Sequence, residues 1–572
     1  MSSSFFGLNV AQQGLYTART ALDITNHNIS NAETEGYSRQ YGVQTALRPL
    51  SNQSRGMIGT GSEIESVGQY RNEYLDYKYW DLTKDLGAYD VKSDALNQME
   101  LLFNEPSDVG FTAYFDDLFT TLQGLSKDPS DIASKTNFVN SAESFTSYLT
   151  DISEQMRSLQ DEANFGVKTS VDSINFSATQ IAQINQQINN LELTGDRAND
   201  LRDERNRLLD DLSKIVSVDI KFVEDVNDQE TLTVTINGQQ LVHGSTANFL
   251  EVKAKDNISN PEDGVDMYDI YWESGKRLYI ENPNLSGELK GYLDVRDGNN
   301  KDNFSATIDS GAGSDTITLS GLNRHDIPTA GQITVNGIDL DYTSYTYNDV
   351  TGEMTMNLDP ATPCPASATV CKMGEPIAFK GIPYYMQQLN EFARTIAREF
   401  NELHESGDSD SGLPLFVYNG YSGSPALDTS VISSYDLLTV DDIMINQAIV
   451  DDASLLQTKT NAGEGEAAND LILAMIDLRH DDEMFAKGVP DNFVQSLISE
   501  LGIDTKQVSN FLNSQEQLTS LVINQRLSMS DVDLDEEATN LIKFQQAYNM
   551  SAKIMSVLDE IYNTTINGLG AR

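Results

Sequence analysis

The sequence has little cysteine, little histidine and no long apolar run, and each shortage narrows what the chain can be. Two cysteines and five histidines among 572 residues leave little material for thiol or imidazole catalysis or for zinc sites. No apolar run approaches the ~20 residues that span a bilayer. The first ten residues lack the basic start and apolar centre of a Sec-type signal peptide. We therefore expect no membrane insertion, and either a cytoplasmic protein or one exported without a cleaved signal.

Positive charge is also scarce. Lys and Arg number 38 against 87 Asp and Glu, which gives a net charge of −49. Nucleic acid is an unfavourable partner for such a chain because it is itself a polyanion. The acidity lies in the middle of the chain, since residues 1–30 are neutral and residues 538–572 carry a net charge of +1. This distribution suits a subunit with packed, near-neutral ends and an acidic exterior, although a generally acidic proteome explains the total charge equally well.

Both ends of the chain repeat apolar residues at helical spacing. Steps of three and four residues keep one stripe of a helix against a partner helix, and only Thr25 and Ser551 interrupt the pattern. A lone helix of this length is marginal in water, so we expect the two ends to pair with each other, with neighbouring copies, or both. The N-terminal stripe is Leu8, Ala11, Leu15, Ala18, Leu22 and Ile29, the C-terminal stripe is Leu541, Phe544, Tyr548, Met555, Leu558 and Tyr562, and a second C-terminal row is Ala547, Ile554 and Ile561.

The middle of the chain changes from helical to alternating period at about residue 217. Thr231–Ile236 and Gln239–His243 flank Asn237-Gly238, which predicts a hairpin with a tight turn. Further strand-like runs are Tyr268–Trp272 and Leu278–Glu281. A second β-rich block covers about residues 301–382, and helical periodicity returns at Tyr384–His404.

These patterns predict an α+β multidomain fold. Terminal coiled-coil-like helices and a helical body come from both halves of the chain, with one or two inserted β-rich domains between them. The expected domains are 1–40 with 538–572 as paired terminal helices, 41–216 with 383–537 as the helical body, 217–298 as a β-rich domain, and 299–382 as an additional β module.

No pattern predicts a catalytic, cofactor or metal site. His404-Glu405 resembles the start of a zinc-protease motif, but the second histidine is replaced by Asp408. The Asp408–Gly412 loop has calcium-like spacing without the closing glutamate, so a solvated loop is favoured. Cys364 and Cys371 lie in a Pro-rich, hairpin-like stretch, which favours a disulfide and an oxidising compartment. A pair of free thiols is the alternative, and zinc is weaker because two thiols are too few.

Three separated motifs carry a family resemblance. Residues 28–40 resemble a signature of flagellar axial proteins, and the ending Tyr37-Ser38-Arg39-Gln40 is similar to that of the hook-associated protein 1 family of hook–filament junction proteins. Residues 533–548 resemble that family's closing motif, and residues 199–205 supply a third match. Glu35 stands where the family usually has proline, and Asp531 where glycine is common. The motif residues of the two ends are Asn28, Ser30, Asn31, Gly36, Tyr37, Asp535, Glu536 and Glu537.

These residues also have a local interpretation. Asn28, Ser30, Asn31 and Gly36 favour caps and turns, so they can end the first helix. The carboxylates at 535–537 suit the first turn of the last helix, where the helix dipole favours negative charge, and we prefer this interpretation to a metal or catalytic role.

The resemblance implies a structural, non-enzymatic subunit of the extracellular bacterial flagellum, with no cofactor. It implies type III export, self-assembly in a helical ring, and contacts with the hook protein and a second junction protein. It also implies a cytoplasmic export chaperone that holds the C-terminal helix. The alternatives are another axial subunit (hook, rod or flagellin-like) or a surface adhesin-type protein that binds through residues 299–382.

Overall fold

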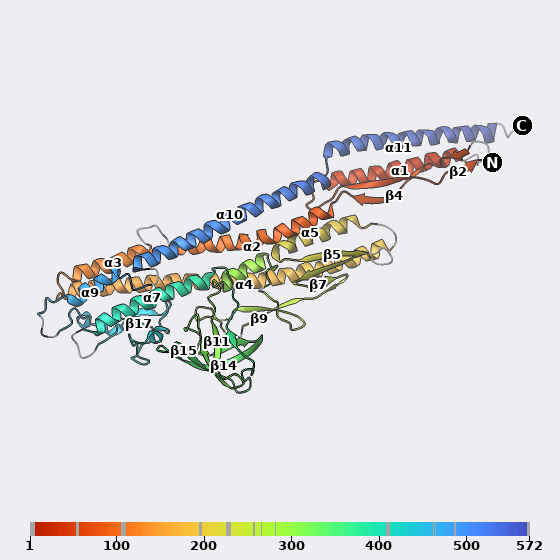
Figure 1. Ribbon diagram of the computed structural model, residues 1–572. Coiled ribbons are helices and arrows are strands. Elements are labelled where there is room, and N and C mark those ends of the chain that lie inside the picture. Colours follow the sequence, from red (N-terminus) through yellow and green to blue (C-terminus); the bar gives the residue numbers. More distant parts are fainter. Residues whose placement is uncertain are drawn as a thin grey trace. The chain divides into compact units, whose positions relative to one another are not determined.

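The computed structural model describes residues 6–568 except 53–55, 104–109, 194–196, 225–229, 256–257, 265, 281, 408–411, 462, 464 and 486–487. The chain divides into two compact units, which are described separately (Figure 1). Unit 1 comprises Met1–Leu86, Asp172–Leu250 and Ser514–Arg572, and unit 2 comprises Gly87–Val171 and Glu251–Asn513. Helices and strands occur in both units, which confirms the α+β class.

Unit 1 holds both terminal helices. Its own elements are α1 (Phe6–Ser30), β1 (Gln40–Ala46), β2 (Leu50–Asn52), β3 (Gly56–Ile58), β4 (Ser62–Gln69), α5 (Asn199–Ile215), β5 (Asp219–Glu224), β6 (Glu230–Ile236), β7 (Gln239–His243), β8 (Thr246–Ala247), α11 (Leu534–Asn563) and the π-helical turn η4 (Thr564–Gly568). Four elements contribute residues to both units: α2 (Glu73–Phe103), α4 (Ile132–Glu192), β9 (Leu250–Ala254) and α10 (Pro490–Ser530).

The sheet of unit 1 has the strand order β5-β6-β7-β8 and is antiparallel. The predicted hairpin at Asn237-Gly238 is confirmed: both turn residues have positive φ, 51° and 78°, as a tight two-residue turn requires. Alternate residues of β6 are buried, and the Asn185 side chain of α4 donates to the carbonyl of Gly244 at 2.8 Å. The sheet is therefore attached to the helices of the same unit.

Unit 2 contains a helical core and a barrel. Its own elements are α3 (Phe111–Leu125), β10 (Tyr268–Trp272), α6 (Glu288–Asp297), β11 (Ser305–Ser310), β12 (Thr316–Ser320), β13 (Gly331–Val335), β14 (Ile338–Asn348), β15 (Glu353–Leu358), β16 (Val370–Lys372), α7 (Ile382–Glu405), β17 (Phe416–Tyr418), η1 (Ile432–Tyr435), β18 (Ile443–Ile445), α8 (Gln447–Asp451), η2 (Ala453–Leu455), α9 (Asp470–Asp477) and η3 (Leu478–His480).

Aromatic side chains fill the helical core of unit 2. Phe392 of α7 contacts both Phe111 and Phe115 of α3, with edge-to-face geometry and ring centroids 5.4 and 5.7 Å away. Phe119 and Phe400 continue the same contact along the two helices. Each of these rings is buried, and rings arranged in this way stabilise the packing beyond the area that they bury.

The second β-rich block folds as a closed antiparallel barrel with the order β11-β12-β15-β14-β13-β16. The short strand β16 closes it by pairing with both β11 and β13. Along β15 every second residue is buried, so Met354, Met356 and Leu358 point into the barrel core. Closure removes exposed strand edges, which suits an insert that must not pair with other chains.

One expectation for residues 217–298 is wrong. Leu278–Glu281 does not form a strand: Leu278 N–H donates once to Ile270, Arg277 makes an isolated bridge with Tyr271, and Glu281 lies outside the described residues. Pro283 follows and cannot continue a ladder, because it has no N–H. The same region also contains a helix, α6, whose short and highly charged sequence gives little apolar periodicity.

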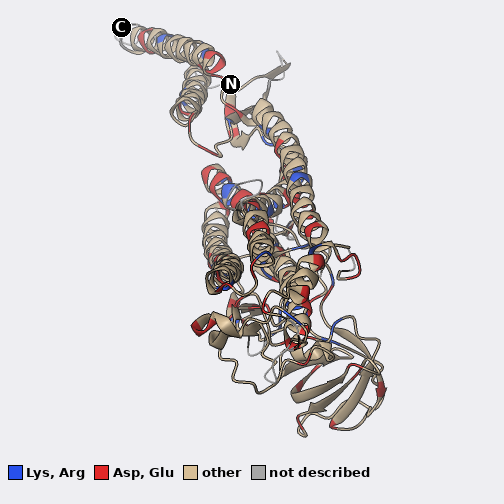
Figure 2. Ribbon diagram, turned by 90° about the vertical axis from the view of Figure 1, so that its left-hand side faces the viewer, with Lys and Arg blue, Asp and Glu red and all other residues tan. Residues whose placement is uncertain are grey.

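The excess of acidic over basic residues in the composition is also visible in the structure. Figure 2 shows Asp and Glu along the helices and loops, with Lys and Arg fewer. Among the described residues, no helix combines the length and apolarity needed to cross a membrane.

Candidate assembly site at the terminal helices

The terminal helices α1 and α11 lie side by side in unit 1 (Figure 1). All six residues of the predicted C-terminal stripe are half-buried, whereas the other positions of α11 after residue 540 are exposed, apart from Ser551 and Ala552. The predicted N-terminal stripe is buried or half-buried along its whole length. The two terminal helices of the chain thus pack against each other in unit 1.

The interrupted position of the C-terminal stripe has a steric reason. A Cβ atom at Gly14 would lie 3.2 Å from the Ser551 Oγ atom, and one at Gly7 would lie 3.5 Å from Leu558. A small residue at 551 therefore allows the helices to approach where a larger apolar residue would clash. The small residue Ser551, which departs from the heptad pattern, is therefore part of the contact between α1 and α11.

A second face of α1 is covered by the hairpin of β1 and β4. Thr17 donates its hydroxyl to the carbonyl of Ser62 at 2.6 Å, and a Cβ at Gly42 would lie 3.1 Å from both Ile24 and Ile64. α1 is thus held between α11 and the hairpin.

The second apolar row of α11 has no such cover. Ala547, Ile554 and Ile561 are exposed, the last two by 52% and 51%. Met550 and Val557, exposed by 68% and 48%, fill the steps between them. The row therefore has the alternating three- and four-residue spacing of a second helix-packing seam.

Asn28 ties the end of α1 to the start of β1. Its side chain is 1% exposed, and its Oδ1 atom accepts from the Tyr37 hydroxyl at 2.8 Å and from the Gln40 N–H at 2.9 Å. Its Nδ2 atom donates to the Gln40 carbonyl at 2.9 Å. Truncating this residue would leave buried polar groups without partners, which is unfavourable.

Asp203 of α5 accepts hydrogen bonds from the segment between α1 and β1 and from β4. It accepts from the Ser38 N–H and from Gln69 Nε2, each at 2.9 Å, and Arg71 lies 3.4 Å away. Burial outweighs these donors and raises the pKa of Asp203 to about 6. This carboxyl joins the N-terminal motif to the motif at residues 199–205.

Arg39 joins the N-terminal motif to the start of α11. Its guanidinium lies 2.8 Å from Glu536 and 2.7 Å from Glu537. Its backbone N–H donates to the Ser530 carbonyl at 2.9 Å. Glu537 is 2% exposed, so its charge depends on this partner. Asp533 caps the helix by accepting from the N–H groups of Asp535 and Glu536.

The other motif residues have smaller parts. Asn31 donates to the His27 carbonyl at 3.0 Å, which closes the last turn of α1. Gly36 has φ 79°, a conformation that favours glycine, and a Cβ there would lie 3.4 Å from Arg207. Ser30 and Asp535 are exposed.

Sequence reasoning missed a further charged cluster in the same unit. Arg526 of α10 binds Asp76 of α2 at 3.0 Å and Asp210 of α5 at 2.9 Å, and its guanidinium lies 4.5 Å from the Tyr79 ring centroid. Charged residues are too common in this chain for spacing alone to single out these three. They hold three helices together next to the start of α11.

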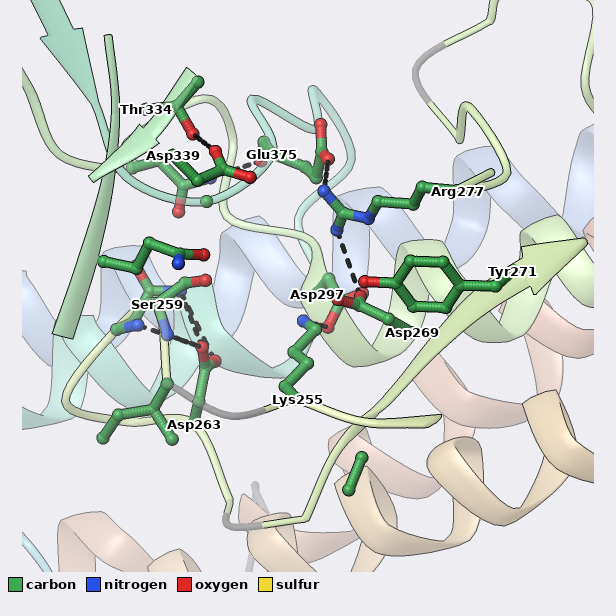
Figure 3. Close-up of a pocket in the computed structure, with 16 residues that line it drawn as sticks. Lys255, Ser259, Asp263, Asp269, Tyr271, Arg277, Asp297, Thr334, Asp339 and Glu375 are labelled. Carbon is green, nitrogen blue, oxygen red and sulfur yellow. Dashed lines mark hydrogen bonds and ion pairs between the residues drawn. The ribbon is translucent and has the colours of Figure 1, made fainter. Parts of the chain in front are cut away.

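A polar cavity of about 140 Å³ lies in unit 2 between the β9–β10 region and the barrel (Figure 3). Arg277 bridges Asp269 and Glu375 at 3.1 Å each, and Lys255 lies 3.5 Å from Asp297. Asp339 accepts from Thr334 at 2.7 Å. These carboxylates already have partners, so the cavity is a polar joint between the barrel and its neighbouring segment.

A buried ion network completes the attachment of the barrel. Arg324 binds Glu262 at 3.0 Å and Asp326 at 2.9 Å, and Asp326 also binds Arg394 of α7 at 2.7 Å. Burial raises the pKa of Glu262, whereas the two guanidinium groups outweigh burial and hold the pKa of Asp326 at about 2. The barrel is thus fixed to two other segments of unit 2.

The cysteines differ from the favoured expectation. Cys364 and Cys371 are free thiols, both buried among the apolar residues of the barrel core, so the expected disulfide is not formed. Cys371 lies in β16, where its thiol is directed at the Ala306 carbonyl of the neighbouring strand, 3.8 Å away. The backbone pairing of β16, and not a covalent link, places this residue.

The described part of the chain contains no group of three or more His, Cys, Asp or Glu side chains that could hold a metal ion. His404 is 1% exposed; its Nδ1 atom donates to Leu413 O at 2.7 Å and its Nε2 atom accepts from Gln457 N at 3.0 Å. Both ring nitrogens are occupied by backbone. Residues 408–411 of the calcium-like loop lie outside the described residues.

Comparison with known proteins finds flagellar proteins. The family model for the flagellar hook-associated protein FlgK helical domain matches residues 96–314, and the model for the flagellar basal body rod FlgEFG protein C-terminal region matches residues 523–568. Flagellar hook-associated protein 1 of Bacillus subtilis (strain 168) is 26% identical over 586 residues, covering 100% of this chain and 99% of the relative. Its counterpart in Escherichia coli (strain K12) is 27% identical over 579 residues, covering 98% and 99%.

The chain is similar along its whole length to members of the flagellar hook-associated protein 1 family. It is a structural, extracellular subunit of the bacterial flagellum at the hook–filament junction, and not an enzyme. The full-length relatives favour this family over the hook, rod and flagellin-like alternatives. A solved structure of the flagellar hook junction protein FlgK from Burkholderia pseudomallei covers 79% of this chain and 100% of its own, at 13% identity and a TM-score of 0.46, which adds no weight to the assignment.

Proposed function

We propose that this junction subunit assembles through its two terminal helices. The predicted stripes join α1 to α11 within one copy, and the second row of α11 packs against terminal helices of neighbouring copies. The observation that carries the proposal is the exposed row Ala547, Met550, Ile554, Val557 and Ile561, which repeats at packing spacing on a helix whose other apolar stripe is already paired.

The charge distribution supports the same arrangement. The ends carry almost no net charge, whereas the whole chain carries −49. Terminal helices from many copies can therefore be packed close together without strong repulsion, while the acidic remainder stays in solvent. Contacts between copies would be heterologous and would follow a helical array, because one face of α11 meets a different face of its neighbour.

The partners follow from this position. The subunit contacts the hook protein at one side of the junction and a second junction protein at the other. Before assembly, the exposed row of α11 is an aggregation hazard, and a cytoplasmic export chaperone covers it until the chain leaves through the type III apparatus. The domain division expected from the sequence, with terminal helices, helical body and two β regions, is the organisation that we propose for the assembled subunit.

Immunogold electron microscopy of isolated flagella tests the location. An antibody against residues 216–382 should label one narrow band between hook and filament. Label along the whole hook or filament would instead indicate a bulk subunit. Absence of label from flagella that retain hook and filament would contradict the proposed function and favour the binding role of residues 299–382.

A further inference from the structure

A groove of about 710 Å³ in unit 2 gathers lysines on an otherwise acidic chain. It is formed by α2, α6, α10 and the segment that precedes α7. Four of its lining residues are lysines and two are aspartates, so its wall has the opposite sign of charge to the chain as a whole. We call it the lysine groove, and its lysines are Lys92, Lys290, Lys301 and Lys380.

The lysine groove also has an apolar floor. Phe511 of α10 is 45% exposed and stacks on Tyr89 of α2, with ring centroids 5.4 Å apart. Ile377 and Val508 are buried beside them, and the Lys92 ammonium lies 4.7 Å from the Phe379 ring centroid. An exposed aromatic ring within a hollow of this size is a feature of protein contact sites.

The carboxylates of unit 2 leave positive charge in the groove. Lys92 and Lys290 share a single carboxylate, Asp294, at 2.5 and 2.6 Å. Lys380 is held by Glu500 at 2.7 Å and Asp504 at 3.1 Å. Lys301 is exposed and lines the same groove, so its ammonium faces solvent.

We propose that the lysine groove receives an acidic segment with an apolar tip from a neighbouring copy of this chain. Copies that each carry −49 repel one another, so lateral packing needs sites of positive charge. The groove supplies such a site, and an acidic neighbour supplies the complement. The contact is heterologous, with the groove of one copy facing a different surface of the next. This inference rests on the proposed function, which places copies side by side.

Photo-crosslinking in assembled flagella tests the occupant. The full-length chain carries p-benzoylphenylalanine in place of Phe511, flagella are isolated and irradiated, and the products are separated and mapped by mass spectrometry. We expect a covalent dimer of this chain whose second peptide is rich in Asp and Glu. The matched control carries the crosslinker in place of Phe165, a ring of the same unit that is 66% exposed and lies outside the groove.

The outcomes separate the two proposals. A crosslink to a different protein, or none from a chain that is present in the flagella, would overturn the groove proposal and leave the junction role intact. A dimer of equal yield from the Phe165 control would show that the groove is not selective. Absence of the full-length chain from isolated flagella would overturn both proposals.

The charge of the groove is tested at Lys301 in the same crosslinkable chain. Lys301→Glu replaces attraction with repulsion at an exposed position, and we expect the dimer yield to fall about 5-fold, as for loss of an exposed ion pair worth ~1 kcal/mol. Lys301→Arg preserves the charge and should preserve the yield. An unchanged yield in Lys301→Glu, or an equal fall in both variants, would contradict an acidic occupant.

Discussion

Arg39 and Glu537 lie 498 positions apart in the chain, yet the guanidinium and the carboxylate are 2.7 Å apart. This contact joins the turn after the first helix to the first turn of the last helix, and Asp203 brings the third motif to the same connector. The three family motifs are therefore one structural element. Taken one at a time, the motif residues form caps and turns. Together, they hold the two ends of the chain against each other.

Arg39→Ala should loosen the start of α11. Glu537 would remain 2% exposed without its partner, and loss of one member of a buried pair costs about 3–5 kcal/mol. We expect faster amide hydrogen exchange at residues 534–545 of the purified chain. Arg19→Ala removes an exposed arginine of α1 and is the matched control. Equal exchange in both variants would show that the Arg39 contact does not hold the helix.

Arg324→Met should destabilise unit 2 through Glu262. The Glu262 side chain is 0% exposed and would lose its guanidinium partner, so we expect a loss of about 3–5 kcal/mol in the free energy of unfolding. Adding Glu262→Gln removes the stranded charge and should recover part of this loss. Urea unfolding of both variants measures the difference. If the double variant is as unstable as the single one, the loss of stability does not come from the unpaired charge of Glu262.

His404 should make unit 2 sensitive to acid. Burial lowers the pKa of His404 to about 4, against an ordinary value of 6.5, and the hydrogen bond to the Leu413 carbonyl offsets only part of this shift. Because the histidine pKa is lower in the folded chain than in the unfolded chain, the folded state has its full stability at a pH above about 6.5. It loses stability as the pH falls from about 6.5 towards 4. At pH 5 the loss is about 2 kcal/mol. His404→Gln should reduce the difference in unfolding free energy between pH 7 and pH 5 by this amount, and an unchanged difference would contradict the shift.

The cysteines should react only after unfolding. Burial raises the pKa of Cys371 to about 12, and the thiolate is the reactive form. We expect the native chain to react slowly with DTNB and the unfolded, unreduced chain to yield two thiols. No reaction before a reductant is added would restore the disulfide interpretation. Replacing both residues with serine should affect the barrel alone.

The spacing of apolar residues predicted much of the fold, because this spacing shows directly which face of a helix or strand is buried. The stripes of both terminal helices, the hairpin at Asn237-Gly238 and the second β block were all visible in this way. Helix α6 was not, since ten residues with Gly291 inside them carry too little period. The strand expected at Leu278–Glu281 did not form because its pairing with β10 is limited to an isolated bridge at Arg277, and Pro283 cannot extend the ladder.

The candidate site was predictable only in its apolar part. A stripe repeats and so can be recognised, whereas Arg39, Asp203 and Arg526 act singly and over long sequence separations. In a chain with 87 acidic residues, charge gives no sign of which carboxylate has a partner. The sequence already excluded a zinc-protease motif at His404 through Asp408, but the backbone partners of this histidine cannot be read from residue types.

The two faces of α11 should respond differently to charge. Leu541→Asp, like Leu15→Asp on α1, places a carboxylate in the paired stripe, where burial of an unpaired charge is unfavourable. Both variants should lose protection of α1 and α11 from amide exchange in the purified chain and should fail to enter the junction. The barrel and the helical core of unit 2 should keep their protection, because the stripe contacts lie in unit 1.

Ile554→Asp is the discriminating variant. Ile554 is 52% exposed on the second row, so the purified chain should keep the exchange protection and stability of the unchanged protein. In assembled flagella the same carboxylate would be buried against a neighbouring copy, and we expect the variant to be exported but not incorporated. Asn9→Asp adds an equal charge at an exposed position of α1 and controls for charge alone. Normal junctions built from Ile554→Asp would show that the second row of α11 is not an assembly surface, even if the stripe variants behave as expected.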